Sequence, residues 1–378
     1  MQPIKLSVCY MVKNEANTLP ISLDSIKSAA DEIIVVDTGS TDSTKKIAAS
    51  YGARLYDFPW QDDFSAPRNF AIEQARGTWI LFLDADEYFA EPLEREKILA
   101  YLDSLGAKDV VLLLRQNAAG SDAQTSWNTD WCLRIFRNLS QLRYQGRIHE
   151  NIARQDGELQ VAYGPVSFRL LHTGYAGPLG TEKARRNLRL IEQAIAEEGW
   201  QPGYDYYLMD CFYGLGEYEK AMQHGKNFLV GDCYAYGGES HIYHVILECM
   251  RALQKPDREM LPWAQEACRK YPSLPEFYAE QGMILCGLGR LAEARQLFIE
   301  ALLRYEEHTA DVEQDGYFSQ EVAAKVAARL GEIAMHYENL DEAAVWFKQS
   351  LEYCSSNRTI LSKVEKFLQW AEKKQKST

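Results

Sequence analysis

Four short apolar runs in the first third of the chain alternate with segments of helical pattern. LSVCYMV (6–12) and EIIVVD (32–37) are followed by WILFLD (79–84) and DVVLLL (109–114). Runs of this length without polar alternation are typical of strands covered on both faces, as in a parallel sheet flanked by helices. The pattern therefore predicts that the chain begins with an open α/β sandwich built on a mostly parallel sheet.

Polar residues stand where these predicted strands end. Asn14 and Glu15 follow the first run, Asp37 ends the second, and Asp84 ends the third. Ligands of open α/β sheets bind outside the carboxyl ends of the strands. We therefore expect these side chains to converge on one edge of the sheet and to form a ligand site there.

The stretch WILFLDADEYF (79–89) carries Asp84 and Asp86 two residues apart. On an extended chain both carboxylates point to the same side. Two carboxylates suit a hard divalent cation such as Mg²⁺ or Mn²⁺, which commonly shares its ligands with the phosphates of a substrate. Acids that cap the next helix would give the same short pattern, so the local sequence leaves both interpretations open.

A recurring heptapeptide replaces the strand pattern in the second half of the chain. It occurs as LGEYEKA (215–221), LGRLAEA (288–294) and YENLDEA (337–343), each before an amphipathic stretch, with a weaker unit at 256–272. Helix–turn–helix units with a small residue at the packing contact resemble tetratricopeptide repeats. The sequence therefore predicts an α/β domain over residues 1–178 and an all-α repeat domain over 179–378, with an ordinary helical bundle as the alternative.

Motifs of the first half resemble those of inverting family-2 glycosyltransferases with the GT-A fold, in the expected order. They are VCYMVKNEANTLPISLDSI, IIVVDTGSTDST and DDFSAPRNFAIEQARGTWILFLDADE, and the resemblance covers about residues 5–175. With helical repeats behind this domain, the chain is similar to a bacterial branch of the family that includes peptide glycosyltransferases modifying bacteriocins. The resemblance implies hexosyl transfer from a nucleotide sugar, with a UDP-linked donor favoured.

The resemblance also implies a set of donor-binding residues. Tyr10 and Glu15 would line the nucleoside pocket, and Asp37 would bond the uracil or the ribose. Arg68 and Asn69 match an Arg-Asn pair of the family, and the guanidinium of Arg68 would bond a phosphate. Two interpretations stay open from the residues alone: Asp37 as a cap with the residues at 40 and 41, and Arg68 in an ion pair with the acids at 62 and 63.

The resemblance assigns the metal role to Asp84 and Asp86, which would bridge Mn²⁺ or Mg²⁺ and the donor diphosphate. His172, in LLHTGYAG, is the predicted third ligand, since an imidazole is acceptable to Mn²⁺ beside two carboxylates. This stretch could equally be only a hinge into the helical domain.

An inverting transfer needs a general base beside the acceptor. In the resembling enzymes a downstream His-Glu motif lies on the acceptor side, and in FRNLSQLRYQGRIHENIA (136–153) this implies Glu150 as the base, with His149 as the alternative. A structural His149, with Glu150 paired to Arg147, is the competing interpretation. Trp127 and Trp131 are candidates for acceptor contact, with core packing as the alternative.

The predicted function is metal-dependent inverting transfer of a sugar to a Ser, Thr or Cys of a polypeptide held by the helical repeats, which present extended concave surfaces. One alternative acceptor is a surface polysaccharide or a lipid-linked glycan. The other alternative is a non-catalytic scaffold with a degenerate nucleotide-binding domain.

Net charge and hydropathy limit which other classes of partner the protein can have. Lys and Arg total 41 against 54 Asp and Glu, a net charge of −13, which argues against nucleic-acid binding. No stretch approaches the ~20 apolar residues of a membrane span, and a cytoplasmic location is expected. The aromatic stretch WQPGYDYYLMDCFYG (200–214) could form a homodimer surface in the helical domain, or pack helix against helix.

Overall fold

The protein is described here by a computed structural model of its chain, which forms two compact units. One unit comprises residues 1–118 and 129–204, and the other comprises 119–128 and 205–378. Within these limits the structure describes residues 4–118, 127–173, 180–231, 239–308 and 320–375.

The first unit extends beyond the predicted boundary at residue 178, because helix α5 (Thr181–Glu198) is part of it. Two ion pairs hold this helix to the α/β domain. Arg189 pairs with Asp62 at 2.6 Å, and Arg147 pairs with Glu197. The change from strands to helices in the sequence therefore precedes the change from one unit to the other.

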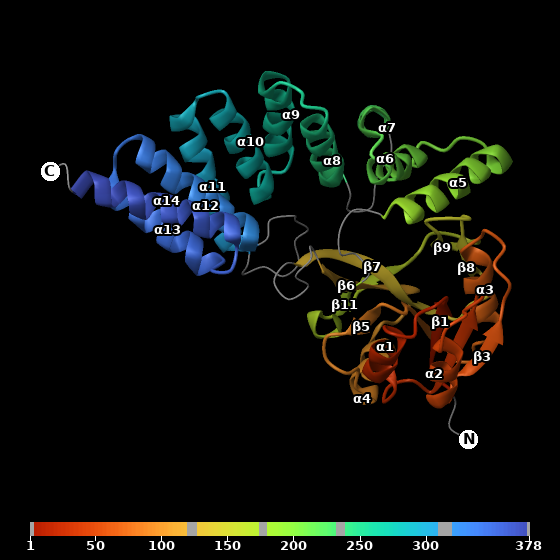
Figure 1. Ribbon diagram of the computed structural model, residues 1–378. Helices are drawn as coiled ribbons and strands as arrows, with labels where there is room; N and C mark the ends of the chain where they lie inside the picture. Colours follow the sequence, from red (N-terminus) through yellow and green to blue (C-terminus); the bar gives the residue numbers. More distant parts are fainter. Residues whose placement is uncertain (1–3, 119–126, 174–179, 232–238, 309–319, 376–378) are drawn as a thin grey trace. The chain divides into compact units, whose positions relative to one another are not determined.

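The first unit contains a mixed sheet, which has nine strands among the described residues (Figure 1). Its order is β3-β2-β1-β4-β7-β6-β11-β5, with β10 beside β6, and β8 and β9 form a separate pair. Strands β1 to β4 pair in parallel, whereas β7 is antiparallel to β4 and β5 to β11. The strands are β1 (Leu6–Val12), β2 (Glu32–Asp37), β3 (Arg54–Asp57), β4 (Trp79–Asp84), β5 (Glu87–Phe89), β6 (Val110–Ala118), β7 (Trp127–Arg137), β8 (Leu142–Gln145), β9 (Asn151–Arg154), β10 (Val161–Tyr163) and β11 (Leu170–His172).

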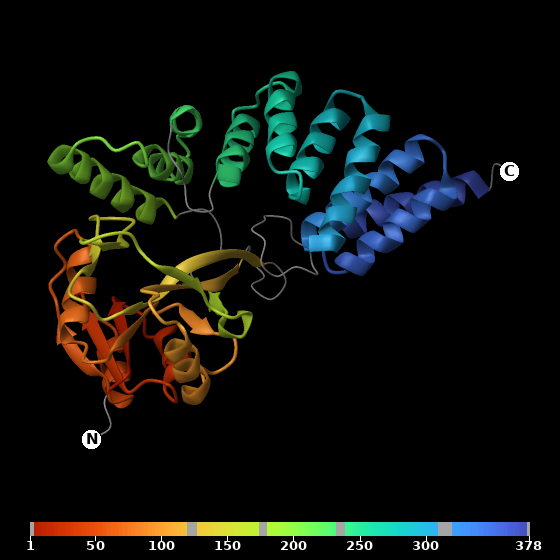
Figure 2. The same ribbon diagram turned by 180° about the vertical axis from the view of Figure 1, so that it is seen from behind.

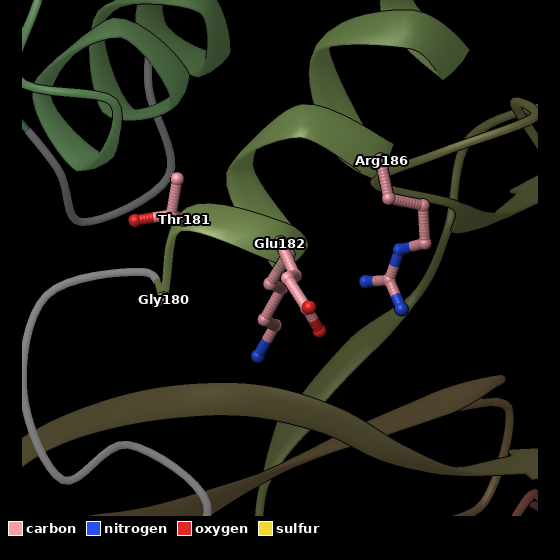
Figure 3. Close-up of a pocket in the computed structure, with 5 residues that line it drawn as sticks. Gly180, Thr181, Glu182 and Arg186 are labelled. Atoms are coloured by element: carbon pink, nitrogen blue, oxygen red, sulfur yellow. The ribbon is translucent and has the colours of Figure 1, made fainter.

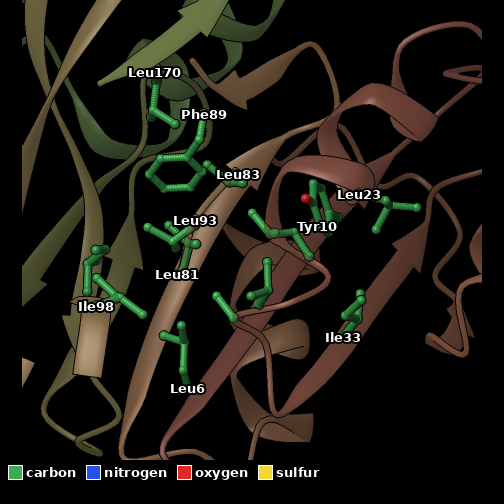
Figure 4. Packing of buried hydrophobic residues seen from close by; sticks show 14 of the residues in the cluster. Leu6, Tyr10, Leu23, Ile33, Leu81, Leu83, Phe89, Leu93, Ile98 and Leu170 are labelled. Carbon is green, nitrogen blue, oxygen red and sulfur yellow. The ribbon is translucent and has the colours of Figure 1, made fainter. Parts of the chain in front are cut away.

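Helices cover both faces of this sheet, which confirms the predicted α/β sandwich. Strand side chains alternate between two apolar clusters, as the period of two requires. Val8, Tyr10 and Leu81 belong to the cluster that also holds side chains of α1 and α4 (Figure 4), whereas Cys9 and Phe82 belong to the cluster with α3. The helices are α1 (Leu19–Ile26), α2 (Thr44–Ser50), α3 (Ser65–Gln74) and α4 (Arg95–Ser104), with the short 3-10 turn η1 (Val166–Phe168).

Apart from residues 127–128, which belong to β7, the regular structure of the second unit is helical in its described part, and the helices follow one another as an array (Figure 2). No helix in the described ranges is both long enough and apolar enough to cross a membrane. The helices are α6 (Tyr204–Gly214), α7 (Tyr218–Val230), α8 (Glu239–Ala252), α9 (Asp257–Lys270), α10 (Pro275–Gly287), α11 (Leu291–His308), α12 (Gln320–His336), α13 (Leu340–Tyr353) and α14 (Arg358–Gln375).

The recurring heptapeptide forms the turn before α7, α11 and α13. Its second residue has a left-handed backbone in each copy, with φ of 75° at Gly216, 72° at Gly289 and 58° at Glu338. A left-handed residue ends one helix and lets the chain reverse into the next. The last residue of each copy is a fully buried alanine: Ala221, Ala294 and Ala343. The predicted helix–turn–helix units are confirmed.

Glycines allow two of these hairpins to close tightly. A Cβ added at Gly282 would lie 2.5 Å from Cε1 of Phe298, and one added at Gly331 would lie 2.7 Å from Cε2 of Phe347. The same pairing of a glycine with a phenylalanine ring therefore joins α10 to α11 and α12 to α13. It is the small-residue contact expected of tetratricopeptide-like repeats.

The aromatic residues of α6 pack within the second unit. Tyr206, Phe212 and Tyr213 lie against its apolar core, which favours the interpretation of this stretch as helix packing. Self-association through the helical unit stays a prediction.

Candidate active site

Strand register brings two of the predicted carboxylates to one edge of the sheet. Val12, the last residue of β1, pairs with Asp37 on one side, and the preceding Met11 pairs with Asp84 on the other. Both acids therefore flank the carboxyl end of β1, where open α/β sheets bind ligands.

The loops that follow β1 and β2 are hydrogen-bonded to each other. The backbone N–H of Asn14 donates to Ser40 Oγ, and the Asn14 side-chain oxygen accepts from the backbone N–H of Thr41, both at 2.8 Å. The N–H of Glu15 donates to Thr44 Oγ1 at 2.8 Å. These bonds join the two loops into one framework beside the acidic edge.

Asp37 is almost fully buried, and one of its oxygens is left over. Its Oδ1 accepts from the backbone N–H groups of Gly39 at 2.9 Å and Ser40 at 2.8 Å, so the capping interpretation holds for this oxygen. Its Oδ2 is buried without a hydrogen-bond partner in the described structure. A buried acceptor without a donor is costly, so a donor group from a ligand fits this position.

Asp84 is held by two arginines. Arg68 Nη2 donates to its Oδ1 at 2.7 Å, and Arg134 Nη2 donates to its Oδ2 at 2.9 Å. Burial alone would raise the pKa of Asp84, but the charges of Arg68 and Arg134 outweigh it and hold this pKa well below its usual range. Both oxygens are therefore engaged, and the carboxylate stays ionised.

Arg68 is buried between Asp84 and Glu150. Its Nε donates to Glu150 Oε1 at 2.6 Å, and its guanidinium lies over the rings of Phe82 and Tyr144. Burial opposes the charged form, but the two carboxylates prevail and raise the pKa of Arg68. Its Nη1 is buried without a partner in the described structure. One N–H edge of a fixed cation is thus available to an anionic ligand.

These contacts correct two sequence interpretations. Arg68 pairs with Asp84 and Glu150 rather than with the acids at 62 and 63. Glu150 pairs with Arg68 rather than with Arg147, which binds Glu197 instead. The sequence suggested partners within a few residues because contacts across 16 and 82 positions leave no local pattern.

Asp86 lies beside the buried His172. Asp86 Oδ2 is 3.3 Å from His172 Nε2, and the other ring nitrogen of His172 is 2.7 Å from Asn117 Oδ1. Two neighbouring ligands of an octahedral Mg²⁺ or Mn²⁺ stand about 3.0 Å apart, given metal–oxygen distances of about 2.1 Å. The pair therefore has the spacing and the donor types of two ligands that share one cation.

The three predicted metal ligands do not form a single cluster. In the described residues, no group of three or more His, Cys, Asp or Glu side chains could hold a metal ion. Both oxygens of Asp84 accept hydrogen bonds from arginines, so Asp86 and His172 are the two predicted ligands that remain for a metal ion. Burial, followed by the nearby charges of Asp86, Asp42 and Asp84, raises the pKa of Glu15. Negative charge is thus concentrated here, and a divalent cation fits the pair.

Sequence reasoning missed a buried chain of ion pairs behind Asp84. Arg134 donates through Nε and Nη2 to both oxygens of the fully buried Glu87, at 2.7 and 2.6 Å. Arg115 joins Glu87, at 3.0 Å, to Asp130. The only signal was the presence of charged residues in strand-like runs, because these partners stand 15 or more positions apart.

Two residues predicted to bind the donor, Tyr10 and Asn69, instead make contacts within the protein. Tyr10 is fully buried among apolar side chains (Figure 4), and its hydroxyl lies 3.0 Å from Ser22 Oγ, so the structure places it in the core rather than at a pocket surface. Asn69 makes two 2.9 Å bonds to the backbone of Tyr144, which attach α3 to β8. Both residues therefore have packing or hydrogen-bonding roles within the domain.

The remaining candidates lie in several settings. His149 is half-buried with a left-handed φ of 54°. The ring of Trp131 meets that of Tyr163 edge to face, with centroids 5.0 Å apart, so it makes a packing contact. The side chain of Trp127 lies outside the described residues.

A separate pocket of about 700 Å³ opens at the start of α5 (Figure 3). None of the predicted site residues lines it. Burial lowers the pKa of Arg186, whereas the charge of Glu150 acts in the opposite direction, so Arg186 is within electrostatic reach of the Arg68–Glu150 pair. The lining residues are Gly180, Thr181, Glu182, Lys183 and Arg186.

Comparison with known proteins agrees with this geometry. Residues 7–160 match the family model described as glycosyl transferase family 2. This range is less than half of the chain, and over it the chain is similar to that family. The matched range contains both loops of the acidic edge, the Asp84–Asp86 pair and Glu150, and the match is to the family that the sequence motifs resemble.

Two curated relatives match a large part of this chain but are themselves longer. A TPR repeat-containing protein of Synechococcus elongatus is 41% identical over 233 residues, covering 60% of this chain and 55% of that protein. The glycosyltransferase SunS of Bacillus subtilis is 27% identical over 261 residues, covering 65% and 58%. The chain thus spans a little over half the length of these curated relatives.

Among solved structures, glucosyl-3-phosphoglycerate synthase from Mycobacterium tuberculosis in complex with Mn²⁺, uridine diphosphate and glucosyl-3-phosphoglycerate is 24% identical. The match covers 31% of this chain and 45% of that one, with a TM-score of 0.26.

Proposed function

We propose that this protein is a metal-dependent inverting glycosyltransferase that uses a nucleotide sugar, with UDP as the favoured nucleotide. The observation that carries the proposal is the edge of a family-2 domain at which Asp86 and His172 lie 3.3 Å apart beside the arginine-held Asp84. Carboxylates with a histidine and a buried arginine are what a metal-bound diphosphate requires.

Two unsatisfied buried atoms support the donor assignment. Asp37 Oδ2 lacks a donor, and a uracil N–H or a ribose hydroxyl supplies one. Arg68 Nη1 lacks an acceptor, and a phosphate oxygen supplies one. A nucleoside diphosphate carries both groups in one molecule. Glu15, whose backbone N–H donates to Thr44 Oγ1 in the framework of the two loops, completes the nucleoside side of the proposed pocket.

Asp86 and His172 are the residues that would hold the metal in this proposal. When bound, Mn²⁺ or Mg²⁺ neutralises negative charge on the leaving diphosphate. Asp84 acts differently in this proposal. It holds Arg68 and Arg134 at fixed positions, so that the guanidinium of Arg68 meets the phosphates in a preset orientation.

Glu150 is the proposed general base, with His149 as the alternative. Arg68 Nε donates to Glu150 Oε1 and holds this carboxylate in a fixed orientation, from which it could accept a proton from an attacking hydroxyl or thiol. Arg68 would thereby link the leaving-group side of the site to the base.

The proposed acceptor is a Ser, Thr or Cys of a polypeptide. The array of helical hairpins supports this choice, because stacked hairpins bind extended chains. A surface polysaccharide or lipid-linked glycan is the second candidate acceptor, and a homodimer through the helical unit is a further proposal.

Nucleotide release tests the function. The protein is incubated with UDP-, GDP- and dTDP-sugars in the presence of Mn²⁺, Mg²⁺ or chelator, beside the Asp84→Asn/Asp86→Asn variant. We expect slow metal-dependent release from one donor, lost in the variant. Absence of both release and nucleotide binding would instead favour a non-catalytic scaffold.

Asp37→Asn provides a matched test of the nucleoside site. The asparagine keeps one oxygen for the N–H groups of Gly39 and Ser40, but it presents an NH₂ group in place of the unsatisfied Oδ2. We expect UDP to bind about 10- to 100-fold more weakly, the cost of one lost buried hydrogen bond to a charged group. Calorimetric titration of UDP measures this, and unchanged affinity would remove Asp37 from the donor site.

A further inference from the structure

We infer that Asn117 and Asp130 fix the tautomer of His172, so that Nδ1 carries the proton and the lone pair of Nε2 faces Asp86. This inference rests on the proposed metal site and adds two positioning residues to it. Neither residue belongs to the motifs that identified the domain.

The orientation of the Asn117 amide is set by Asp130. Asn117 Nδ2 lies 3.3 Å from Asp130 Oδ1, and an ionised carboxylate can only accept hydrogen bonds. The NH₂ group of Asn117 must therefore face Asp130, and Arg115 holds that carboxylate in place. The amide oxygen is left to face the opposite side.

The amide oxygen in turn sets the tautomer of His172. Asn117 Oδ1 is 2.7 Å from His172 Nδ1, and an amide oxygen cannot donate, so Nδ1 must be the donor. In the neutral ring the other nitrogen, Nε2, then has the lone pair. It is this nitrogen that lies 3.3 Å from Asp86 Oδ2, where the proposed cation would sit.

Burial and strand pairing make this arrangement rigid. Asn117 and His172 have 8% and 6% of their surface exposed, and they are register partners on the parallel strands β6 and β11. The contacts also close a ring that connects the two acids of the 84–86 pair. In order, it runs through Asp84, Arg134, Glu87, Arg115, Asp130, Asn117, His172 and Asp86.

The tautomer can be observed without metal. In full-length protein labelled with ¹⁵N-histidine, nitrogen chemical shifts at about pH 8 distinguish the protonated ring nitrogen, and a His172→Gln variant assigns the signal. We expect Nδ1 of His172 to be protonated. A neutral ring protonated at Nε2 would overturn the inference, whatever the activity of the protein.

Binding of Mn²⁺ alone tests the consequence for the metal. The paramagnetic resonance signal of free Mn²⁺ is titrated with protein, and Asp86→Asn gives the baseline for unrelated acidic sites. We expect Asn117→Leu to weaken Mn²⁺ binding about 10- to 100-fold, as loss of a partner behind a histidine ligand usually does. The exchange Asn117→Asp/Asp130→Asn keeps an acceptor beside Nδ1 and a donor beside that acceptor, and should bind within about threefold of the original protein.

The outcomes separate the two claims. Equal Mn²⁺ affinity in Asn117→Leu, or an exchange variant as weak as Asn117→Leu, would contradict the roles of Asn117 and Asp130. Absence of Mn²⁺ binding above the Asp86→Asn baseline in the original protein would instead contradict the proposed metal site, and the nitrogen shifts would still decide the tautomer.

Discussion

Asp86→Asn is expected to reduce metal-dependent nucleotide release by roughly 1,000-fold while leaving the stability of the first unit nearly unchanged. An amide is a poorer ligand for a hard cation than a carboxylate, and several kcal/mol of charge neutralisation on the leaving group would be lost with the metal. Stability should be spared because Asp86 is partly exposed and its backbone oxygen, which accepts from Thr173, is retained. Mn²⁺ titration, nucleotide release and thermal unfolding measure the three quantities.

Asp84→Asn is the matched comparison, and the structure predicts a different profile for it. The asparagine cannot neutralise Arg68 and Arg134, so unfolding should become easier, while Mn²⁺ binding to Asp86 and His172 is retained. If the two variants lost Mn²⁺ binding equally, the division of roles within the 84–86 pair would be wrong, and both acids would be metal ligands.

Arg134→Met should lower the free energy of unfolding of the first unit by about 3–5 kcal/mol, the usual cost of removing one partner from a buried ion pair. Arg134 neutralises two acids at once, and Glu87 has no solvent exposure. Among the described residues, Arg115 alone would remain as a cationic partner of Glu87. Denaturant unfolding followed by a probe confined to this unit measures the change, since two units need not unfold together.

Two further variants show whether charge is the reason. Removing the buried acid as well, in Arg134→Met/Glu87→Gln, should recover part of the lost stability, because the uncompensated charge is gone. Lys27→Met, which removes the exposed partner of Asp24, should change stability little, since exposed pairs are screened by water. An additive double variant would show that the loss comes from packing.

Much of the secondary structure of both units was determined by local sequence. Continuous apolar runs predicted β1, β2, β4 and β6, because a strand covered on both faces must be apolar throughout. The heptapeptides predicted the helical turns, since a left-handed residue followed by a helix start is a local requirement. The polar residues at the ends of the predicted strands located the acidic edge, because ligands of open α/β sheets bind at the carboxyl ends of the strands.

Partnership among the charged residues was decided by the tertiary structure. Arg68, Arg134 and Asn117 carry no local signal for Asp84, Glu87 or His172, because helix α3 and the strands that carry these residues meet only once the sheet has formed. The same holds for Tyr10, which a motif placed at the nucleoside and the strand alternation placed in the core. Sequence therefore determined where the site lies and which chemical groups it contains. Folding decided which acid is held by arginines and which faces a histidine, because side-chain pairing across a sheet depends on strand order and register.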